Sequence, residues 1–278
     1  MKGLKFLDTG LSMSHQKFMD DNILFGHPSF QEARAFKSLL NTFSEASGTS
    51  VNPAKSQIFF FNTPAITQAS IARILGFSIA YLPAKYLGAP LIDSAINNSS
   101  WNILLEKLEA RLSSWNFRAL NMASRLVLIK FVLQPMPLYL FSVLAAPKWV
   151  LKQIKVLQRR FLWGSSGQNR KWALVNSNTI FTPKEAGGLE LRDPTHSNIV
   201  MGGRLWWKWT SNPSTPWAKL WNAKYANNWP PEELIRLFPA VPDSLIWTAA
   251  KQHNDLIQQH SFWEIRNGGT AKFWTDAW

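Results

Sequence analysis

The chain has 278 residues, of which 46% are hydrophobic and 17% charged, and its formal net charge is +13. This length and apolar content suffice for a buried core and predict one large or two ordinary domains. The absence of cysteine excludes disulfide bonds and cysteine-based zinc or thiol chemistry, so no disulfide partner is expected. The longest apolar stretch, 131–147, is interrupted by Gln134 and two prolines and is shorter than the ~20 residues of a membrane helix, so no membrane span is expected.

The first predicted elements are short strands around an adjacent pair of aspartates. Residues 5–8 and 17–25 have strand-like sequences. Asp20 and Asp21 lie within the second segment, between apolar residues. Two neighbouring carboxylates on a tight hairpin can supply part of the oxygen cage that two-metal phosphoryl transfer needs. Asp-Asp-Asn is also a favourable turn sequence, so a solvated loop is the alternative interpretation.

A helix is predicted next, and its two ends carry recognisable signals. Ser29 and Glu32 form a capping-box pattern at its start, and Gly48 ends it. Apolar residues recur between these ends at helical spacing and include Phe36 and Phe43. We expect this stripe to pack on the neighbouring sheet.

The chain then alternates between strand and helix before it becomes mostly helical. Residues 57–61 predict a strand, residues 67–75 a helix, and a strand around 86–88 would complete a small antiparallel sheet. Further helices are predicted after the cap Ser100 and over 122–133. The stripe of the helix after Ser100 comprises Trp101, Leu104, Leu105, Leu108, Leu112 and Trp115. The fold class is therefore α+β.

The positive charge is concentrated between Ala110 and Lys184, where no acidic residue occurs. The basic residues of this block are Arg111, Arg118, Arg125, Lys130, Lys148, Lys152, Lys155, Arg159, Arg160, Arg170, Lys171 and Lys184. After Pro147 a helix would carry Lys148, Lys152, Lys155 and Arg159 on one face, because they recur at i, i+4, i+7 and i+11. The lack of counter-charges favours nucleic acid as the partner; a solvated face and an anionic membrane surface are the alternatives.

Tryptophan dominates the last part of the chain. Eleven of the fifteen tryptophans follow Gly164. Aromatic rings can stack on unpaired bases, but tryptophan more often anchors a core because it buries a large area. We favour packing, since Trp206, Trp209, Trp217 and Trp221 recur at helical spacing.

Other catalytic chemistries find no matching pattern. The five histidines are scattered without zinc-binding spacing, and neither a glycine-rich phosphate loop nor a nucleophile elbow occurs. His15, beside the aspartate pair, is interpreted as a hairpin residue rather than a ligand.

Several segments, in order, resemble the reverse transcriptases of non-LTR (LINE-type) retrotransposons, particularly the plant elements. The aspartate pair in 14–26 resembles the aromatic-x-Asp-Asp hairpin of that family, and 46–56 is similar to its Gly-x-x-x-Asn-x-x-Lys-Ser segment. Residues 85–91 look like its Lys-Tyr-Leu-Gly segment. Residues 183–189 and 266–278 are similar to the region that leads into its zinc-binding segment.

The resemblance implies a role for each matching residue. Asp20 and Asp21 would bind Mg²⁺, and Lys55 would lie near the phosphates of the incoming nucleotide. Lys85, Tyr86, Leu87 and Gly88 would contact the DNA primer. The RNA template and the primer would also meet the basic block 110–184, with contacts from Lys148, Lys152, Lys155, Arg159 and Arg160. A nuclear, or otherwise intracellular, location is expected from the family.

The resemblance also implies three regions. Residues 1–97 would form the rear half of a polymerase palm, and residues 98–165 a basic, helical, thumb-like bundle. Residues 166–278 would form a tryptophan-rich, mainly helical linker that precedes the zinc-binding segment.

The family's metal site needs a third aspartate from an earlier palm strand. Asp8 is the sole acidic residue before Asp20, and its spacing leaves no room for the helix that the palm requires between them. We therefore expect a truncated polymerase that does not extend a primer alone. The alternatives are a non-catalytic nucleic-acid-binding protein derived from such an element, and an unstable product that exposes sheet edge and apolar surface.

Overall fold

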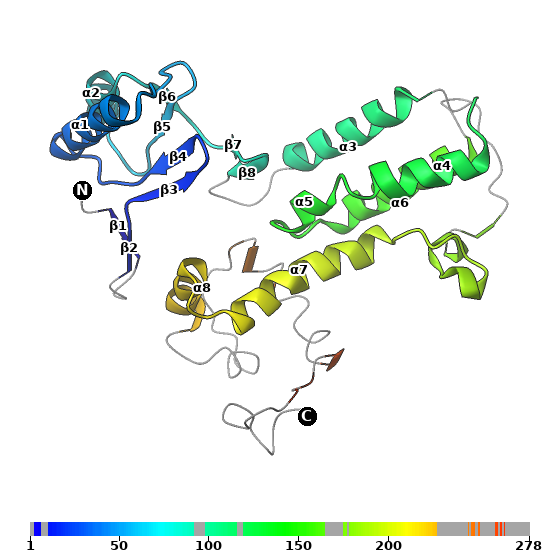
Figure 1. Cartoon of the computed structure of the whole chain (residues 1–278). Coiled ribbons are helices and arrows are strands. Elements are labelled where there is room, and N and C mark those ends of the chain that lie inside the picture. Colours follow the sequence, from blue (N-terminus) through cyan, green and yellow to red (C-terminus); the bar gives the residue numbers. More distant parts are fainter. Residues whose placement is uncertain are drawn as a thin grey trace. The chain divides into compact units, whose positions relative to one another are not determined.

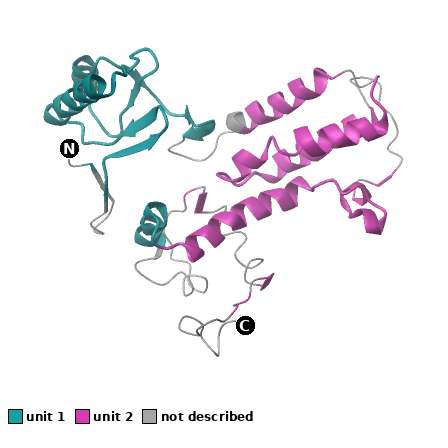
Figure 2. Cartoon of the chain, viewed as in Figure 1, with its two compact units in different colours: residues 1–93, 214–234 teal, residues 94–213, 235–278 magenta. Residues whose placement is uncertain are grey.

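The computed structural model describes residues 3–6, 11–91, 98–115, 119–164, 175–176, 178–226, 244, 246–247, 250, 259–260, 262 and 264. These residues form a mixture of helices and short strands, which confirms the α+β class. The chain divides into two compact units (Figure 2). Unit 1 comprises residues 1–93 and 214–234, and unit 2 comprises residues 94–213 and 235–278. The predicted boundary at 97/98 lies near this division, and the predicted boundary at 165/166 falls outside the described residues.

Short strands pair two by two in unit 1 (Figure 1). Three pairs are antiparallel: β1 Leu4–Phe6 with β2 Leu11–Met13, β3 His15–Phe18 with β4 Asp21–Leu24, and β7 Ala84–Tyr86 with β8 Ala89–Leu91. The pair β5 Gln57–Phe59 with β6 Ser78–Ala80 is parallel. The predicted antiparallel pairing is therefore confirmed for three of the described pairs and wrong for β5 with β6, and the described strands form separate pairs rather than one sheet. The helix α2 Ala65–Leu75 connects β5 to β6, and such a crossover lets two successive strands run in the same direction.

The long helix of unit 1, α1 Phe30–Ser47, has the predicted ends. The Ser29 hydroxyl accepts a hydrogen bond from the Glu32 N–H at 3.2 Å, and Gly48 ends the helix with a left-handed φ of 67°. The Glu32 carboxylate accepts from the His27 N–H at 2.8 Å. The side chain thus reaches two residues before the cap, where it holds the chain that enters the helix.

The core of unit 1 is small and lies between α1 and α2 Ala65–Leu75, which ends at Gly76 as predicted. Its buried members are Ala33, Phe36, Ile71 and Leu75, with Leu24, Ile58, Phe60, Ile74 and Phe77 partly buried against them. Phe43 remains 44% exposed, so the predicted stripe is buried only in its first half. Unit 1 also contains α8 Pro216–Trp221 and the π-helical turn η5 Asn222–Ala226.

The described secondary-structure elements of unit 2 are all helices or helical turns. Its elements are α3 Asn98–Ser113, α4 Met122–Leu128, the π-helix η2 Ile129–Leu133, α5 Leu138–Phe141, α6 Lys148–Trp163, the 3-10 turns η3 Thr179–Phe181 and η4 Lys184–Ala186, and α7 Pro194–Ser211. The predicted helix over 122–133 is confirmed, with its last part widened to π geometry. The predicted cap Ser100 is wrong, because α3 begins at Asn98 and contains Ser100.

One hydrophobic core joins the helices of unit 2, and α6 runs through it. Residues with almost no exposure include Trp101, Ile129, Ile154 and Leu162, which come from α3, η2 and α6. Ile180 belongs to the same core although it lies beyond the predicted boundary at 165/166. Because burying each such side chain contributes about 1.5–3 kcal/mol, this core fixes α6 firmly.

Candidate nucleic-acid interface

Asp20 and Asp21 lie at the tip of the predicted hairpin. The register pairs Phe18 with Asp21, so Met19 and Asp20 form a two-residue turn. Met19 adopts a left-handed φ of 53°. Two-residue hairpins need such angles to match the twist of their strands, and glycine or asparagine usually supplies them. Both aspartates are exposed.

The hairpin presents two carboxylates and only part of a metal cage. Mg²⁺ takes six oxygen ligands in a strict octahedral geometry, so two carboxylates must be supplemented. Within the part of the chain that the structure describes, no three histidine, aspartate or glutamate side chains are grouped as metal ligands. Asp8 lies outside the described residues. These two side chains alone do not fit a complete Mg²⁺ site, and we derive no catalytic step from them.

Lys55 occupies an exposed turn before β5. The Asn52 side chain accepts a hydrogen bond from the Ala54 N–H at 2.9 Å, and the Asn52 carbonyl accepts from the Ser56 hydroxyl at 2.8 Å. These bonds shape the loop that carries the lysine. In the described residues no ion pair joins Lys55 to Asp20 or Asp21.

The Lys-Tyr-Leu-Gly segment forms a second hairpin. Lys85 and Tyr86 belong to β7, whereas Leu87 and Gly88 form the turn, with φ values of 48° and 85°. Two successive positive φ angles are typical of a type I′ turn. The predicted strand over 86–88 is therefore wrong at its last two residues. The hydroxyl of Tyr86 is buried without a hydrogen-bond partner in the described residues.

The predicted basic helix is present as α6, and it is amphipathic. Its buried face contains Val150, Leu151, Ile154, Leu157, Gln158, Phe161, Leu162 and Trp163. Lys148, Lys152 and Arg160 are exposed, while Lys155 and Arg159 are half-buried. No acidic residue occurs in this helix.

Lys155 makes a contact that the sequence analysis missed. Its Nζ lies 2.7 Å from Oδ2 of Asp193, and Oδ1 of Asp193 accepts from the Thr195 N–H at 2.7 Å at the start of α7. Burial raises the pKa of Asp193, but the hydrogen bonds from Lys155 and Thr195 lower it more, so the net shift is downward. Lys155 therefore joins α6 to α7 and is less available to a phosphate.

A second carboxylate lies close to two more lysines of the basic block. Oε2 of Glu190 lies 3.0 Å from Nζ of Lys130 and 3.9 Å from Nζ of Lys184. The hydrogen bond from Lys130 lowers the pKa of Glu190, with the charges of both lysines acting in the same direction. The expectation that the block lacks counter-charges is wrong for Lys130, Lys155 and Lys184, because the chain that follows folds back with its acidic residues.

The basic surface is consequently smaller than the sequence indicates. Arg125 donates from Nη1 to the Leu162 carbonyl at 3.4 Å and packs over Gly164, where a Cβ would collide with the guanidinium. Arg118, Arg170 and Lys171 lie outside the described residues. Some exposed cations of the block have no carboxylate partner in the described part of the structure. These are Arg111, Lys148, Lys152 and Arg160.

Most described tryptophans pack in cores, as predicted. Trp206, Trp209 and Trp247 of unit 2 are buried, with ring centroids 5.0–5.8 Å apart. In unit 1, Trp217 contacts Trp221 edge-on at 5.3 Å. Base stacking is thus excluded for the buried rings of unit 2, whereas Trp149 and Trp207 are 37% and 54% exposed.

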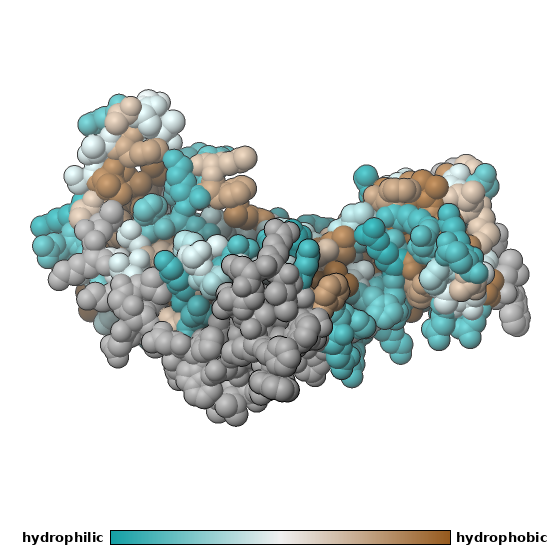
Figure 3. Space-filling model, turned by 60° about the horizontal axis from the view of Figure 1, so that its bottom comes forward, coloured by the Kyte–Doolittle hydropathy of each residue, from teal (hydrophilic) through white to brown (hydrophobic). Residues whose placement is uncertain are grey.

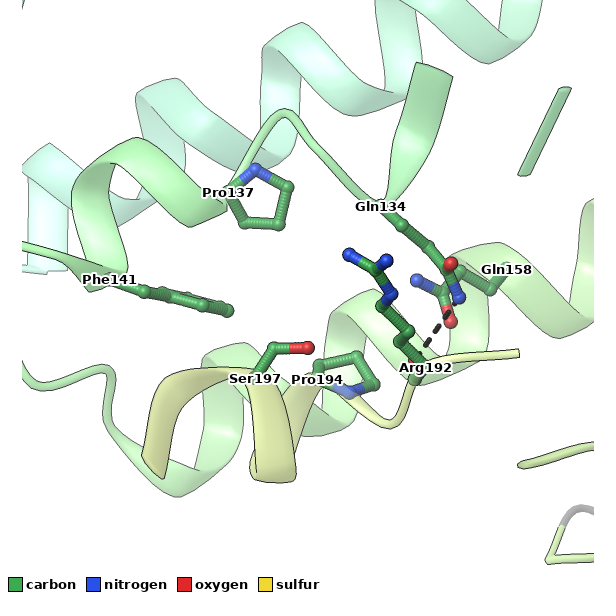
Figure 4. Close-up of a pocket in the computed structure, with 7 residues that line it drawn as sticks. All are labelled: Gln134, Pro137, Phe141, Gln158, Arg192, Pro194 and Ser197. Atoms are coloured by element: carbon green, nitrogen blue, oxygen red, sulfur yellow. Dashed lines mark hydrogen bonds between the residues drawn. The ribbon is translucent and has the colours of Figure 1, made fainter. Parts of the chain in front are cut away.

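A small pocket lies beside α6 in unit 2. Gln134, Phe141, Gln158 and Ser197 line it, and the Gln134 amide donates to the Arg192 carbonyl at 3.2 Å (Figure 4). Its volume is about 10 Å³, which is roughly the space of one water molecule. This pocket therefore does not admit a nucleotide.

Comparison with known proteins gives one partial similarity. No protein-family model matches the sequence. The chain is 29% identical over 196 residues to a putative ribonuclease H protein of Arabidopsis thaliana. The match covers 68% of this chain and 30% of that relative, so the chain spans less than a third of the relative's length. Among the helices in the described ranges, none has the length and apolarity to cross a bilayer.

Proposed function

We propose that this chain is part of a non-LTR retrotransposon reverse transcriptase, with the rear half of the palm in unit 1 and a thumb-like, nucleic-acid-binding bundle in unit 2. The observation that carries the proposal is the aspartate pair on an exposed two-residue hairpin, followed in order by the other family-like segments. The similarity to a protein named as a putative ribonuclease H supports a nucleic-acid substrate. A nuclear location follows from the same proposal.

In this proposal the exposed residues of unit 1 keep the roles that the resemblance implies. Asp20 and Asp21 supply carboxylate oxygens to Mg²⁺, and Lys55 approaches the phosphates of the nucleotide. Residues 85–88 present their hairpin to the primer. The two aspartates would be part of the ligand set of a metal that supplies charge stabilisation for phosphoryl transfer, and further ligands would be needed to complete that set.

The metal role can be tested directly with Fe²⁺ in place of Mg²⁺. A bound Fe²⁺ produces hydroxyl radicals with ascorbate and peroxide, and these cut the backbone near the ion. We expect cuts around residues 18–22 that disappear in the Asp20→Asn, Asp21→Asn double variant. Equal cutting in both proteins would contradict a metal role for the pair.

We do not expect primer extension by this chain alone. Positioning and charge stabilisation provide most of the catalysis of phosphoryl transfer, and two carboxylates do not align the primer hydroxyl. Nucleotide incorporation should equal that of an Asp20→Ala, Asp21→Ala control. Incorporation above this control would show that the chain assembles a complete site.

A second candidate function is nucleic-acid binding without catalysis, favoured by the exposed cations of α6. If Lys148, Lys152, Arg160 and Arg111 meet phosphates, log K should fall with log salt at a slope between about −3 and −4. The same estimate for six contacts would be about −5. Affinity that does not change between about 50 and about 200 mM salt would contradict both candidate functions.

A further inference from the structure

Trp149 is unusual among the described tryptophans because it lies at the surface of the basic helix. It occupies the first turn of α6 and is 37% exposed. Trp207 of α7 is also exposed, whereas the other described tryptophans with known burial are partly or fully buried, as Trp115 is against Phe161 at 5.2 Å. Trp149 has no ring contact in the part of the chain that the structure describes. Its large apolar face is therefore left available to an external partner.

The helix geometry places Trp149 on the solvent side, next to basic residues. Trp149, Gln153, Val156 and Arg160 recur at i, i+4, i+7 and i+11, so they share one face. Lys152, three residues after the tryptophan, lies at the edge of this face, and Lys148, one residue before it, lies about 100° round the helix axis from Trp149. The α6 face, defined as Lys148, Trp149, Lys152 and Arg160, thus combines an indole with three cations.

The lysines of the α6 face are available to an external anion. Lys155, on the same helix, is held by Asp193, whereas Lys148 and Lys152 make no ion pair within the described ranges. The surface of the described residues shows hydrophobic areas among hydrophilic ones (Figure 3). An aromatic ring between unpaired cations is the combination that binds single-stranded nucleic acid, because the cations follow the phosphates while the ring stacks on a base.

We propose that Trp149 stacks on an unpaired base and gives the α6 face a preference for single-stranded over duplex nucleic acid. The inference rests on the proposed nucleic-acid binding and adds the residue that selects the form of the strand. In a duplex the faces of the bases are covered by their neighbours, so only the phosphates remain for the cations. Stacking adds affinity without sequence preference, since every base has a π-face.

The test compares two ligands and three variants in the full chain. A short labelled oligothymidylate and a hairpin duplex of the same charge are titrated by fluorescence anisotropy. Trp149→Leu should weaken binding of the single strand about tenfold and leave duplex binding nearly unchanged, because it removes the π-face and keeps an apolar side chain. Trp149→Phe should retain most of the affinity. Trp207→Leu, the same change at an exposed site of α7, should have little effect.

The outcomes separate this inference from the proposed function. If the unaltered chain binds neither ligand, or binds them without salt dependence, the proposed function fails. If it binds with salt dependence but Trp149→Leu weakens both ligands equally or neither, only the stacking role fails. A melting temperature equal to that of the unaltered chain shows that Trp149→Leu is folded, and Trp149→Phe repeats the comparison with a smaller change.

One outcome would assign the face to a different partner. Tryptophan and lysine on an amphipathic helix also suit an anionic membrane surface. Sedimentation with phosphatidylserine vesicles at the same salt concentration measures this. Tight vesicle binding that Trp149→Leu abolishes, together with unchanged binding of the oligothymidylate, would overturn the stacking role.

Discussion

The two units differ in how much core supports the residues with candidate functions. Among the described residues, the cluster between α1 and α2 contains four buried residues, while the cluster around α6 contains seventeen. In unit 1 the aspartates project from a two-stranded hairpin whose Phe18 and Met19 are 52% and 78% exposed. Isolated hairpins are marginally stable in water. The comparison indicates that a large core supports the proposed α6 face, whereas the aspartate hairpin needs further packing to hold metal ligands in place.

The largest expected effect tests the core beneath α6. Ile154→Ala removes a side chain that is 1% exposed, and it should lower the free energy of unfolding by about 2–5 kcal/mol through lost contacts and a cavity. Urea denaturation measures the change. Val127→Ala, at a site of α4 that is 52% exposed, is the control and should cost far less. Equal losses in the two variants would contradict the supporting role of this core.

Removal of the contact between α6 and α7 should have the next largest effect on stability. Asp193→Ala removes the cap of α7 and the partner of Lys155, and it should destabilise the protein by about 1–3 kcal/mol. A double-mutant cycle with Lys155→Met isolates the ion pair. Additive losses in the cycle would show that the two side chains do not interact.

The pH dependence of that link has a defined sign. The pKa of Asp193 is lower in the folded protein than in the unfolded chain, so its stabilisation is present above the unfolded value, about 3.9. It is lost as the pH falls through the folded value. The stability difference between the unaltered protein and Asp193→Asn should therefore be constant from about pH 5 to 7 and should shrink below about pH 4. A difference that grows on acidification would contradict the assignment.

Substitutions at the tip of the aspartate hairpin should change stability least, and one of them should stabilise the hairpin. Met19 pays a steric cost at φ 53° that glycine does not, and its side chain is exposed, so little packing is lost. Met19→Gly should stabilise the hairpin by about 1 kcal/mol, and Met19→Val should destabilise it. Amide hydrogen exchange of β3 and β4 reports the local change. Slower exchange in the valine variant than in the glycine variant would show that the turn does not limit this region.

The sequence predicted local features better than distant ones, for a physical reason. The caps Ser29 and Gly48 and the stop at Gly76 depend on a few neighbouring residues, and they are as predicted. The aspartate hairpin was likewise predicted from its turn. The parallel pairing of β5 with β6 depends on the crossover through α2, which no residue pattern of either strand specifies.

The candidate site shows the same limit. The periodicity of α6 predicted which residues share a face, but not which of them form ion pairs within the protein. Lys155 and Asp193 are 38 positions apart, and Lys130 and Glu190 are 60 apart. Charge counted along the chain therefore overestimates the surface that is available to phosphates. Trp149 could have been noticed as an aromatic residue between two lysines at the start of the helix.

The salt dependence of nucleic-acid affinity tests the central claim most directly. We would measure it for the unaltered chain and for the Lys148→Ala, Lys152→Ala, Arg160→Ala triple variant. We expect binding by the unaltered chain to weaken with salt at a slope between about −3 and −4, and the slope of the variant to be smaller in magnitude by about 2.7. A steep slope that the triple variant leaves unchanged would place the interface elsewhere and contradict the role of the α6 face.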